Sequence, residues 1–175
     1  MNRSEVKNKA CQVLSKEVFS RACAALPLVS IDLMITRPGD QGRDLLLGLR
    51  NNRPAQNWWF TPGGRIRKNE PLPTALRRVA QDEVGLNLKW LNRAQLLGAW
   101  DHFYPDSAFD SSISTHYVNL PYALHLREVE AKALQPLSGQ GLQHQAWIWM
   151  SLAQAAIDER VHCYVRTILP RLVAS

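Results

Sequence analysis

The segment from Gly64 to Leu86, GRIRKNEPLPTALRRVAQDEVGL, constrains the fold of this chain more than any other stretch. Its apolar residues recur at spacings of three and four, as on the buried side of a helix: Leu72, Ala75, Leu76, Val79, Ala80 and Val84. Asn69 is predicted to cap this helix, and Pro71 is tolerated in its first turn. Gly85 suits the left-handed position that ends a helix. The pattern therefore predicts an amphipathic helix after a Gly-Gly turn.

Glu83 occupies an unfavourable place for an anion in this helix. It lies in the last turn, where the helix dipole disfavours negative charge, and it borders the apolar stripe. Arg78 and Asp82 are four residues apart and are predicted to pair, which leaves Glu83 for another partner. An acid in such a position usually has a cation as partner, but for an isolated helix an ordinary solvated glutamate at the helix end is the favoured interpretation.

The same segment resembles the Nudix box. That pattern runs Gly, five residues, Glu, seven residues, and then Arg-Glu-U-x-Glu-Glu-x-Gly-U, where U is aliphatic. Six positions are in register: Gly64, Glu70, Arg78, Glu83, Gly85 and Leu86. Asp82 is a conservative replacement for a Glu, whereas Val79 replaces the Glu that follows the arginine. The resemblance implies a Nudix hydrolase that keeps Glu83 as a metal carboxylate and has lost another.

Length and charge narrow the class further. The chain has 175 residues, of which 46% are hydrophobic, so one domain of mixed class spanning residues 1–175 is expected. The formal net charge is +6 and the pI is about 9.5, which suits anionic substrates such as nucleotides. The basic residues are scattered rather than clustered, so a nucleic-acid partner is not favoured.

Cysteine usage and hydropathy indicate a cytoplasmic protein. The three cysteines form no Cys-x-x-Cys pair, and a disulfide framework or zinc site is not expected. Lys16, Glu17 and Arg21 interrupt any apolar core of a signal peptide, and no apolar run approaches the ~20 residues that span a bilayer. We therefore expect no membrane segment.

Periodicity predicts further helices and strands around the box helix. Expected helices cover residues 4–25, 151–159 and 161–173, and expected strands cover 28–36, 44–49, 58–61, 95–103, 115–126 and 145–150. Ser151 is predicted to cap a helix, and Pro170 to kink or end the last one. Within the single domain, residues 1–26 hold the N-terminal helix, 64–86 the box, and 151–175 the C-terminal helices. Strands around a central helix predict an α+β protein.

Segments outside the box resemble the family of GDP-mannose mannosyl hydrolases, Nudix enzymes that release the sugar of a GDP-hexose. The similar segments keep the same order: PLVSID (27–32), NRPAQ (52–56), WFTPGGR (59–65), HFY (102–104), THYV (115–118) and Gln143-His144. The resemblance implies a Nudix-type α/β/α sandwich with a mixed sheet and a catalytic helix after the Gly-Gly turn. It also implies a homodimer and a GDP-sugar substrate.

The resemblance implies one Mg²⁺ ion per site, with Mn²⁺ as an alternative ion. Its ligands would be Glu83, Gln143 and a carbonyl of the Gly-Gly turn, taken as that of Gly64. An all-oxygen set suits a hard cation that also binds substrate phosphates. His144 matches the general base, and imidazole titrates near neutrality. The residues next to His144 lack the acids found there in the family, so the sequence shows no partner for the imidazole.

The other implied site residues would hold the substrate. Arg50 and Arg65 match phosphate-binding arginines, whose guanidinium groups suit phosphate oxygens. Tyr117 would assist the leaving group, and Asp32, an acid inside an apolar strand, would lie near the sugar or pair with arginine. Two further contacts to the substrate are implied: His102 and Tyr104. Each of three residues also has a purely structural interpretation. Arg50 could be a surface charge at a strand end, Arg65 could be a turn residue that shields Glu70, and Tyr117 could be packed in the core.

Three functions follow, in order of preference. The first is Mg²⁺-dependent hydrolysis of GDP-mannose or a related GDP-hexose to GDP and free sugar, by water attack at the anomeric carbon. Because Val79 cannot bind metal, the remaining ion would stabilise the leaving group, and His144 would supply the base. The second is a nucleotide-sugar pyrophosphohydrolase that attacks phosphorus, which Asp82 permits by helping to bind a second ion. The third is a non-catalytic module that senses a nucleotide sugar or binds nucleic acid.

Overall fold

Strand β1 (Leu28–Gly39) lies at the centre of a mixed sheet. It runs parallel to β7 (Thr115–His125) and antiparallel to β2 (Gly42–Arg50). The computed structural model describes residues 13–139 and 142–173. The remaining strands are β3 (Trp59–Phe60), β4 (Gly63–Arg65), β5 (Gln95–Leu96), β6 (Trp100–Tyr104) and β8 (His144–Ser151). The strand order is β3-β2-β1-β7-β5, with β4 on β1, β6 on β7 and β8 on β2.

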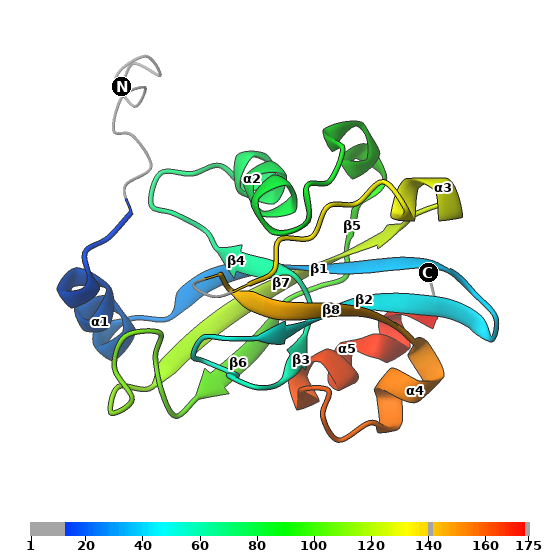
Figure 1. Cartoon of the computed structure of the whole chain (residues 1–175). Coiled ribbons are helices and arrows are strands. Elements are labelled where there is room, and N and C mark those ends of the chain that lie inside the picture. The colour runs from blue at the N-terminus through cyan, green and yellow to red at the C-terminus, as the bar shows by residue number, and fades with distance from the viewer. Residues whose placement is uncertain (1–12, 140–141, 174–175) are drawn as a thin grey trace, which may run out of the picture.

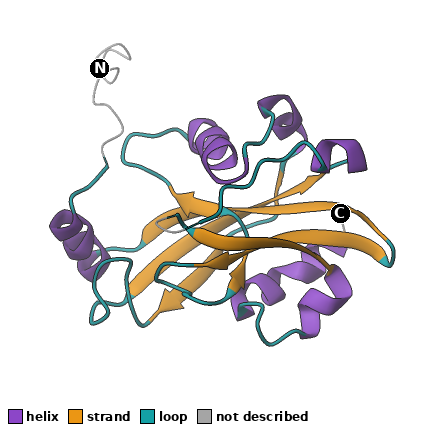
Figure 2. Cartoon of the chain, in the orientation of Figure 1, coloured by secondary structure: helices purple, strands orange, loops and turns teal. Residues whose placement is uncertain are grey.

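Helices cover both faces of this sheet. They are α1 (Lys16–Ala25), α2 (Leu72–Val84), the 3-10 helix η1 (Leu88–Arg93), α3 (Glu128–Ala131), α4 (Leu152–Ile157) and α5 (Cys163–Val173). Helices α2 and α3 lie on one side of the sheet, and α4 and α5 lie on the other (Figures 1 and 2). The expected α+β fold with a mixed sheet is confirmed. None of the helices in the described ranges is long and apolar enough to cross a membrane.

Alternation along β1 divides the apolar residues between two cores. Ile31, Leu33 and Ile35 pack with the apolar side of α2, whereas Met34 packs with α5 on the opposite face. Ser30 and Asp32 point away from the face that carries Ile31 and Leu33, and they therefore lie on the same face of the sheet as Met34. This places a polar stretch at the end of the α4–α5 face.

The box helix forms where its periodicity predicts. Ala75, Val79, Ala80 and Val84 are its buried residues, and Gly85 ends it with a φ of 58°, the left-handed conformation expected there. The predicted cap is wrong: Pro71 is the N-cap, and Asn69 lies earlier, in a turn with a φ of 64°. Asn69 serves the turn because Asn tolerates positive φ better than most residues.

Several predicted boundaries need correction. The first helix begins at Lys16 with Ser15 as its cap, and residues 13–15 are not helical, while residues 4–12 lie outside the described ranges. The strand predicted over 95–103 is split into β5 and β6 around Gly98, whose φ is 143°. Ser151 caps α4 as predicted, but α4 ends at Ile157, and α5 continues through Pro170. Neither η1 nor α3 was predicted.

Candidate active site

Glu70, just before α2, is a structural carboxylate. It accepts hydrogen bonds from Arg78 Nε at 2.6 Å, Arg78 Nη2 at 2.9 Å and the backbone N–H of Arg67 at 2.8 Å. These bonds, above all those from Arg78, lower the pKa of Glu70. Arg78 also donates to the carbonyl of Arg65 at 2.9 Å. The pair therefore fastens the turn before α2 to the helix, and Arg78, not Arg65, shields Glu70.

The two carboxylates at the end of α2 have different surroundings. The side chain of Asp82 is 56% exposed and lies 3.9 Å from Arg78, so the predicted pair is loose because Glu70 holds the arginine more closely. The side chain of Glu83 is only 17% exposed. Val79 is buried in the core between the helix and the sheet. Glu83 is thus the carboxylate of α2 that faces inward.

His144, the first residue of β8, lies against Glu83. Its Nδ1 atom is 3.4 Å from Glu83 Oε2, and its ring centroid is 4.4 Å from that of Trp147. The side chain is 1% exposed. The sequence neighbours of His144 supply no acid, but the fold brings in Glu83 from a distant helix. Neither imidazole nitrogen has a hydrogen-bond partner among the described residues, so Glu83 lies beside the ring without hydrogen-bonding to it.

Gln143, the residue before His144, contacts the Gly-Gly turn that precedes the box helix. Its Nε2 donates to the carbonyl of Gly63 at 3.1 Å, so the carbonyl that it contacts belongs to Gly63 rather than to Gly64. Glu83 in turn lies next to His144, the residue after Gln143. The carboxylate of Glu83, the amide of Gln143 and the carbonyl of Gly63 are therefore close to one another, although they belong to three separate segments of the chain. These are oxygen donors of the kind that Mg²⁺ accepts, so the residues present fit that ion.

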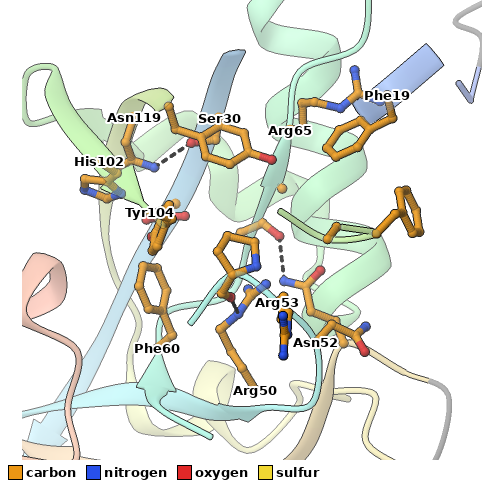
Figure 3. A pocket seen from close by; sticks show the side chains of 18 of the residues that line it. Phe19, Ser30, Arg50, Asn52, Arg53, Phe60, Arg65, His102, Tyr104 and Asn119 are labelled. Atoms are coloured by element: carbon orange, nitrogen blue, oxygen red, sulfur yellow. Dashed lines mark hydrogen bonds between the residues drawn. The ribbon is translucent and has the colours of Figure 1, made fainter. Parts of the chain in front are cut away.

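A cavity of about 420 Å³ opens beside this group and is shown in Figure 3. Its volume is in the range typical of small-molecule sites. Eight of the ten predicted site residues line it: Asp32, Arg50, Gly64, Arg65, His102, Tyr104, Tyr117 and Gln143. The other two, Glu83 and His144, are not part of its wall. The structure therefore brings the substrate-binding candidates together and places the inward carboxylate and the imidazole next to them.

Asp32 is the buried acid of this cavity, with a relative exposure of 6%. Its pKa is raised to about 7, chiefly by burial and to a lesser extent by the nearby Glu83, while Arg50 and the Asn119 amide oppose the shift. A side chain on Gly63 would collide with this carboxylate, so glycine is needed at that position. Asp32 therefore titrates close to neutral pH, within reach of a bound ligand.

Among the described residues, three arginines line the cavity: Arg50, Arg65 and Arg53, of which Arg53 lies 3.7 Å from Asp106. Arg50 donates from Nε to the carbonyl of Pro54 at 2.9 Å, and its guanidinium lies 5.7 Å from the ring centroid of Phe60. The guanidinium of Arg65 lies 5.3 Å from the ring centroid of Phe19, on α1. Aromatic contacts limit how these side chains move while leaving the charges at the cavity. The arrangement suits an anionic ligand such as a diphosphate.

The tyrosines and His102 are neutral groups in this wall. Burial raises the pKa of Tyr117 to about 12 and raises that of Tyr104 as well, so both phenols keep their protons near neutrality. Burial lowers the pKa of His102 to about 4, and its ring stacks on Tyr164 with centroids 4.1 Å apart. The phenols can donate hydrogen bonds, while His102 remains uncharged.

Sequence reasoning missed several residues of the cavity wall. Asn119 is a polar residue within β7, between Val118 and Leu120, which is a visible but unspecific signal. Phe19 and Phe109 form an edge-to-face pair with centroids 5.4 Å apart, one from α1 and one from the loop after β6. No sequence pattern connects these two segments, since only the tertiary fold brings them to one cavity.

The comparisons with known proteins agree with this geometry. The model of the NUDIX domain matches residues 27–171. The low-salt glycan biosynthesis protein Agl8 of Haloferax volcanii is 42% identical over 103 residues, which cover 59% of this chain and 62% of that protein. The match therefore spans less than two thirds of that relative.

Solved structures show the same fold. The NUDIX domain of Shewanella oneidensis NrtR, in complex with ADP ribose, gives a TM-score of 0.63 at 17% identity and covers 93% of this chain and 100% of that chain. The MutT NUDIX hydrolase from Burkholderia pseudomallei gives a TM-score of 0.61 at 26% identity, covering 83% of this chain and 98% of that chain. The first likeness concerns the fold alone.

Proposed function

Because this chain belongs to the NUDIX family, we propose that it is a metal-dependent hydrolase that converts GDP-mannose or a related GDP-hexose to GDP and the free sugar. The observation that carries this proposal is the composition of the cavity. Arginines lie at its wall together with a buried polar floor that includes Asp32. A diphosphate joined to a sugar has complementary chemistry, since one end is anionic and the other carries hydroxyls. The name of the Haloferax relative, a glycan biosynthesis protein, is in keeping with such a substrate.

The predicted site residues have distinct roles in this reaction. Arg50 and Arg65 bind the phosphates. Tyr117, whose phenol keeps its proton, donates a hydrogen bond to the departing phosphate oxygen. His102 and Tyr104 contact the substrate from β6. Glu83, Gln143 and the Gly64 carbonyl of the Gly-Gly turn would hold a divalent ion, Mg²⁺ or Mn²⁺, which when bound neutralises charge that develops on the diphosphate.

The proposed bond cleavage is at carbon. A water oxygen attacks the anomeric carbon, the bond from that carbon to the β-phosphate oxygen breaks, and its electron pair leaves with GDP. His144, which lies beside Glu83, accepts the proton from the water. Ionised Asp32 stabilises the positive charge that develops on the sugar ring. Val79 supports this choice because the box has a core residue where a further metal carboxylate would stand.

The test is hydrolysis of GDP-mannose with Mg²⁺ in ¹⁸O-labelled water, with the products identified by mass spectrometry. We expect label in free mannose and unlabelled GDP. GMP with mannose 1-phosphate would reject attack at carbon. If neither this nor any other GDP-hexose is turned over, a binding module becomes the better description, and binding to RNA or DNA that weakens with salt would identify its ligand class.

A pyrophosphohydrolase that attacks phosphorus is the second candidate. Two observations favour it: the side chain of His144 is buried and is not part of the cavity wall, and that of Asp82 is exposed on α2, next to Glu83. In that reaction Asp82 would help to bind a second ion and the label would enter a phosphate. The same experiment therefore separates the two candidates.

A homodimer is part of the proposal, as the family resemblance implies. Sedimentation velocity of the purified chain tests it, and a mass of one chain at micromolar concentration would reject it.

A further inference from the structure

Asn119 is a buried amide in the floor of the cavity. It lies on β7 opposite Ser30 of β1, and its relative exposure is 1%. Its Nδ2 donates to Ser30 Oγ at 2.9 Å, the bond drawn in Figure 3. Both residues line the cavity. The side chain is therefore anchored at one end and borders the space that a ligand would fill.

The other end of this amide has no hydrogen-bond partner among the described residues. Its acceptor atom, Asn119 Oδ1, is fully buried and accepts no hydrogen bond from any described residue. Rotating the amide by half a turn would bond Oδ1 to Ser30 and leave Nδ2 less well satisfied, so neither orientation satisfies the whole group. Buried polar groups in proteins are nearly always hydrogen-bonded, because an unmatched one loses its contacts with water. A structural role in holding Ser30 does not account for the second polar atom.

The neighbours of Asn119 are polar and face the same cavity. Asp32 follows Ser30 by two residues on β1, and the Asn119 amide is one of the groups that oppose the rise in its pKa. His102 Nε2 is a second buried atom without a hydrogen-bond partner among the described residues. In Figure 3 Asn119, Ser30 and His102 lie together, apart from Arg50, Arg53 and Asn52. The cavity thus has a hydrogen-bonding region around Asn119, Ser30 and His102, at a distance from Arg50. Arg65 is the nearest cation to this region, since it pairs with Ser30 on the neighbouring strand.

We propose that Asn119 determines specificity by accepting a hydrogen bond from one hydroxyl of the substrate's sugar through Oδ1. This inference rests on the proposed function, since it takes the sugar of a nucleotide sugar to lie beside Asn119, Ser30 and His102, where Asp32 also faces the cavity. A site built to pair with a substrate hydroxyl discriminates strongly against an analogue that lacks it, because the buried acceptor is then left unmatched. Asn119 contacts the substrate but takes no part in bond cleavage.

The experiment compares kcat/KM for GDP-mannose and four analogues that each lack one sugar hydroxyl, at carbon two, three, four or six. In the wild type, kcat/KM for one of the four analogues should be about 10- to 100-fold lower than for GDP-mannose. In Asn119→Ala the difference in kcat/KM between GDP-mannose and that analogue should shrink to about two- to threefold. The order of kcat/KM among the other three analogues should stay the same. Asn52→Ala, which alters another asparagine of the cavity wall, should preserve the wild-type difference.

The outcomes separate this inference from the proposed function. If Asn119→Ala keeps the wild-type loss of kcat/KM for that one analogue, the inference is overturned and the proposed function is not affected. The same holds if the wild type has equal kcat/KM values for all four analogues. No turnover of any GDP-hexose overturns both. If Asn119→Ala does not fold, Ser30→Ala replaces it, because loss of the hydroxyl that anchors Nδ2 should weaken the same discrimination. An unchanged loss of kcat/KM in Ser30→Ala would then count against the inference.

Discussion

Acidic side chains near α2 have different roles because their surroundings differ. Glu70 is bonded by Arg78 and is withdrawn from solvent, while Asp82 is exposed. Glu83 faces His144. The same functional group thus stabilises the fold at one position, is largely exposed at the next, and lies against His144 at the third. A pattern of residue types cannot distinguish these roles without the positions of the neighbours.

Replacement of Glu83 tests its assignment. Glu83→Gln keeps the side-chain size but removes the charge that a divalent ion needs, so Mg²⁺-dependent turnover should fall by about 10²–10³-fold. The measurement is kcat against Mg²⁺ concentration. Asp82→Asn, a change at the adjacent exposed carboxylate, is the matched control and should remain near wild type. An equal loss in both variants would show that Asp82 also binds metal.

Glu70 should make stability depend on pH. Its pKa is lowered from the ordinary value of 4.5, mainly by Arg78. The stabilisation is therefore present above the unfolded pKa and is lost as the pH falls through the folded one. Glu70→Gln should lower the free energy of unfolding by about 2–4 kcal/mol near neutral pH. The difference from wild type should narrow as the pH falls below the ordinary glutamate value of 4.5.

Urea unfolding across this pH range measures the effect, with Asp82→Asn as the exposed control. A difference that stays constant down to the lowest pH would mean that Glu70 acts through packing rather than through its charge.

At the scale of secondary-structure elements, the sequence predicted most of what local chemistry determines. The period of α2, its end at Gly85 and the cap of α4 at Ser151 were read correctly because each depends on neighbours within a few residues. The short elements η1 and α3 were missed, and the start of α1 was placed too early. The elements η1 and α3 are joined by a tertiary contact, the Arg93–Glu130 ion pair at 2.7 Å, whereas α1 begins at a local cap, Ser15, that the prediction overlooked.

Gly48 on β2 tests how strand packing positions His144. A side chain at Gly48 would collide with the imidazole, so Gly48→Ala should displace that ring while leaving the arginines in place. We expect kcat to fall by roughly tenfold or more with little change in KM, since small misplacements of a reacting group are costly. Steady-state kinetics with GDP-mannose measures both.

Gly85→Ala is the control for general destabilisation. It introduces a side chain at a φ of 58° and should cost about 1 kcal/mol without moving His144. If Gly48→Ala keeps the wild-type kcat, the position of the imidazole does not limit the reaction.

For the whole molecule, the sheet separates two apolar cores, and the candidate site draws on both sides of it. Glu83 comes from the helix on one face, whereas Asp32 and Asn119 lie on strand faces that point the other way. The sequence predicted eight residues that line the cavity because a family resemblance aligned them. The contact between Glu83 and His144, the anchoring of Asn119 and the aromatic pair from α1 were not predictable, since each joins segments that share no local pattern.

This arrangement predicts that ligands stabilise the entire fold. GDP with Mg²⁺ would contact α2, the Gly-Gly turn and the start of β8 together, a combination that the unfolded chain does not offer. At ~100 times the dissociation constant, such a ligand adds about 2.7 kcal/mol, which corresponds to roughly 5–10 °C in Tm for a chain of this size. Scanning calorimetry with and without GDP and Mg²⁺ measures this shift. In Glu83→Gln the arginines still bind GDP, so GDP alone should give the same shift as in wild type, while the increment from Mg²⁺ should disappear. An undiminished Mg²⁺ increment in that variant would place the ion elsewhere.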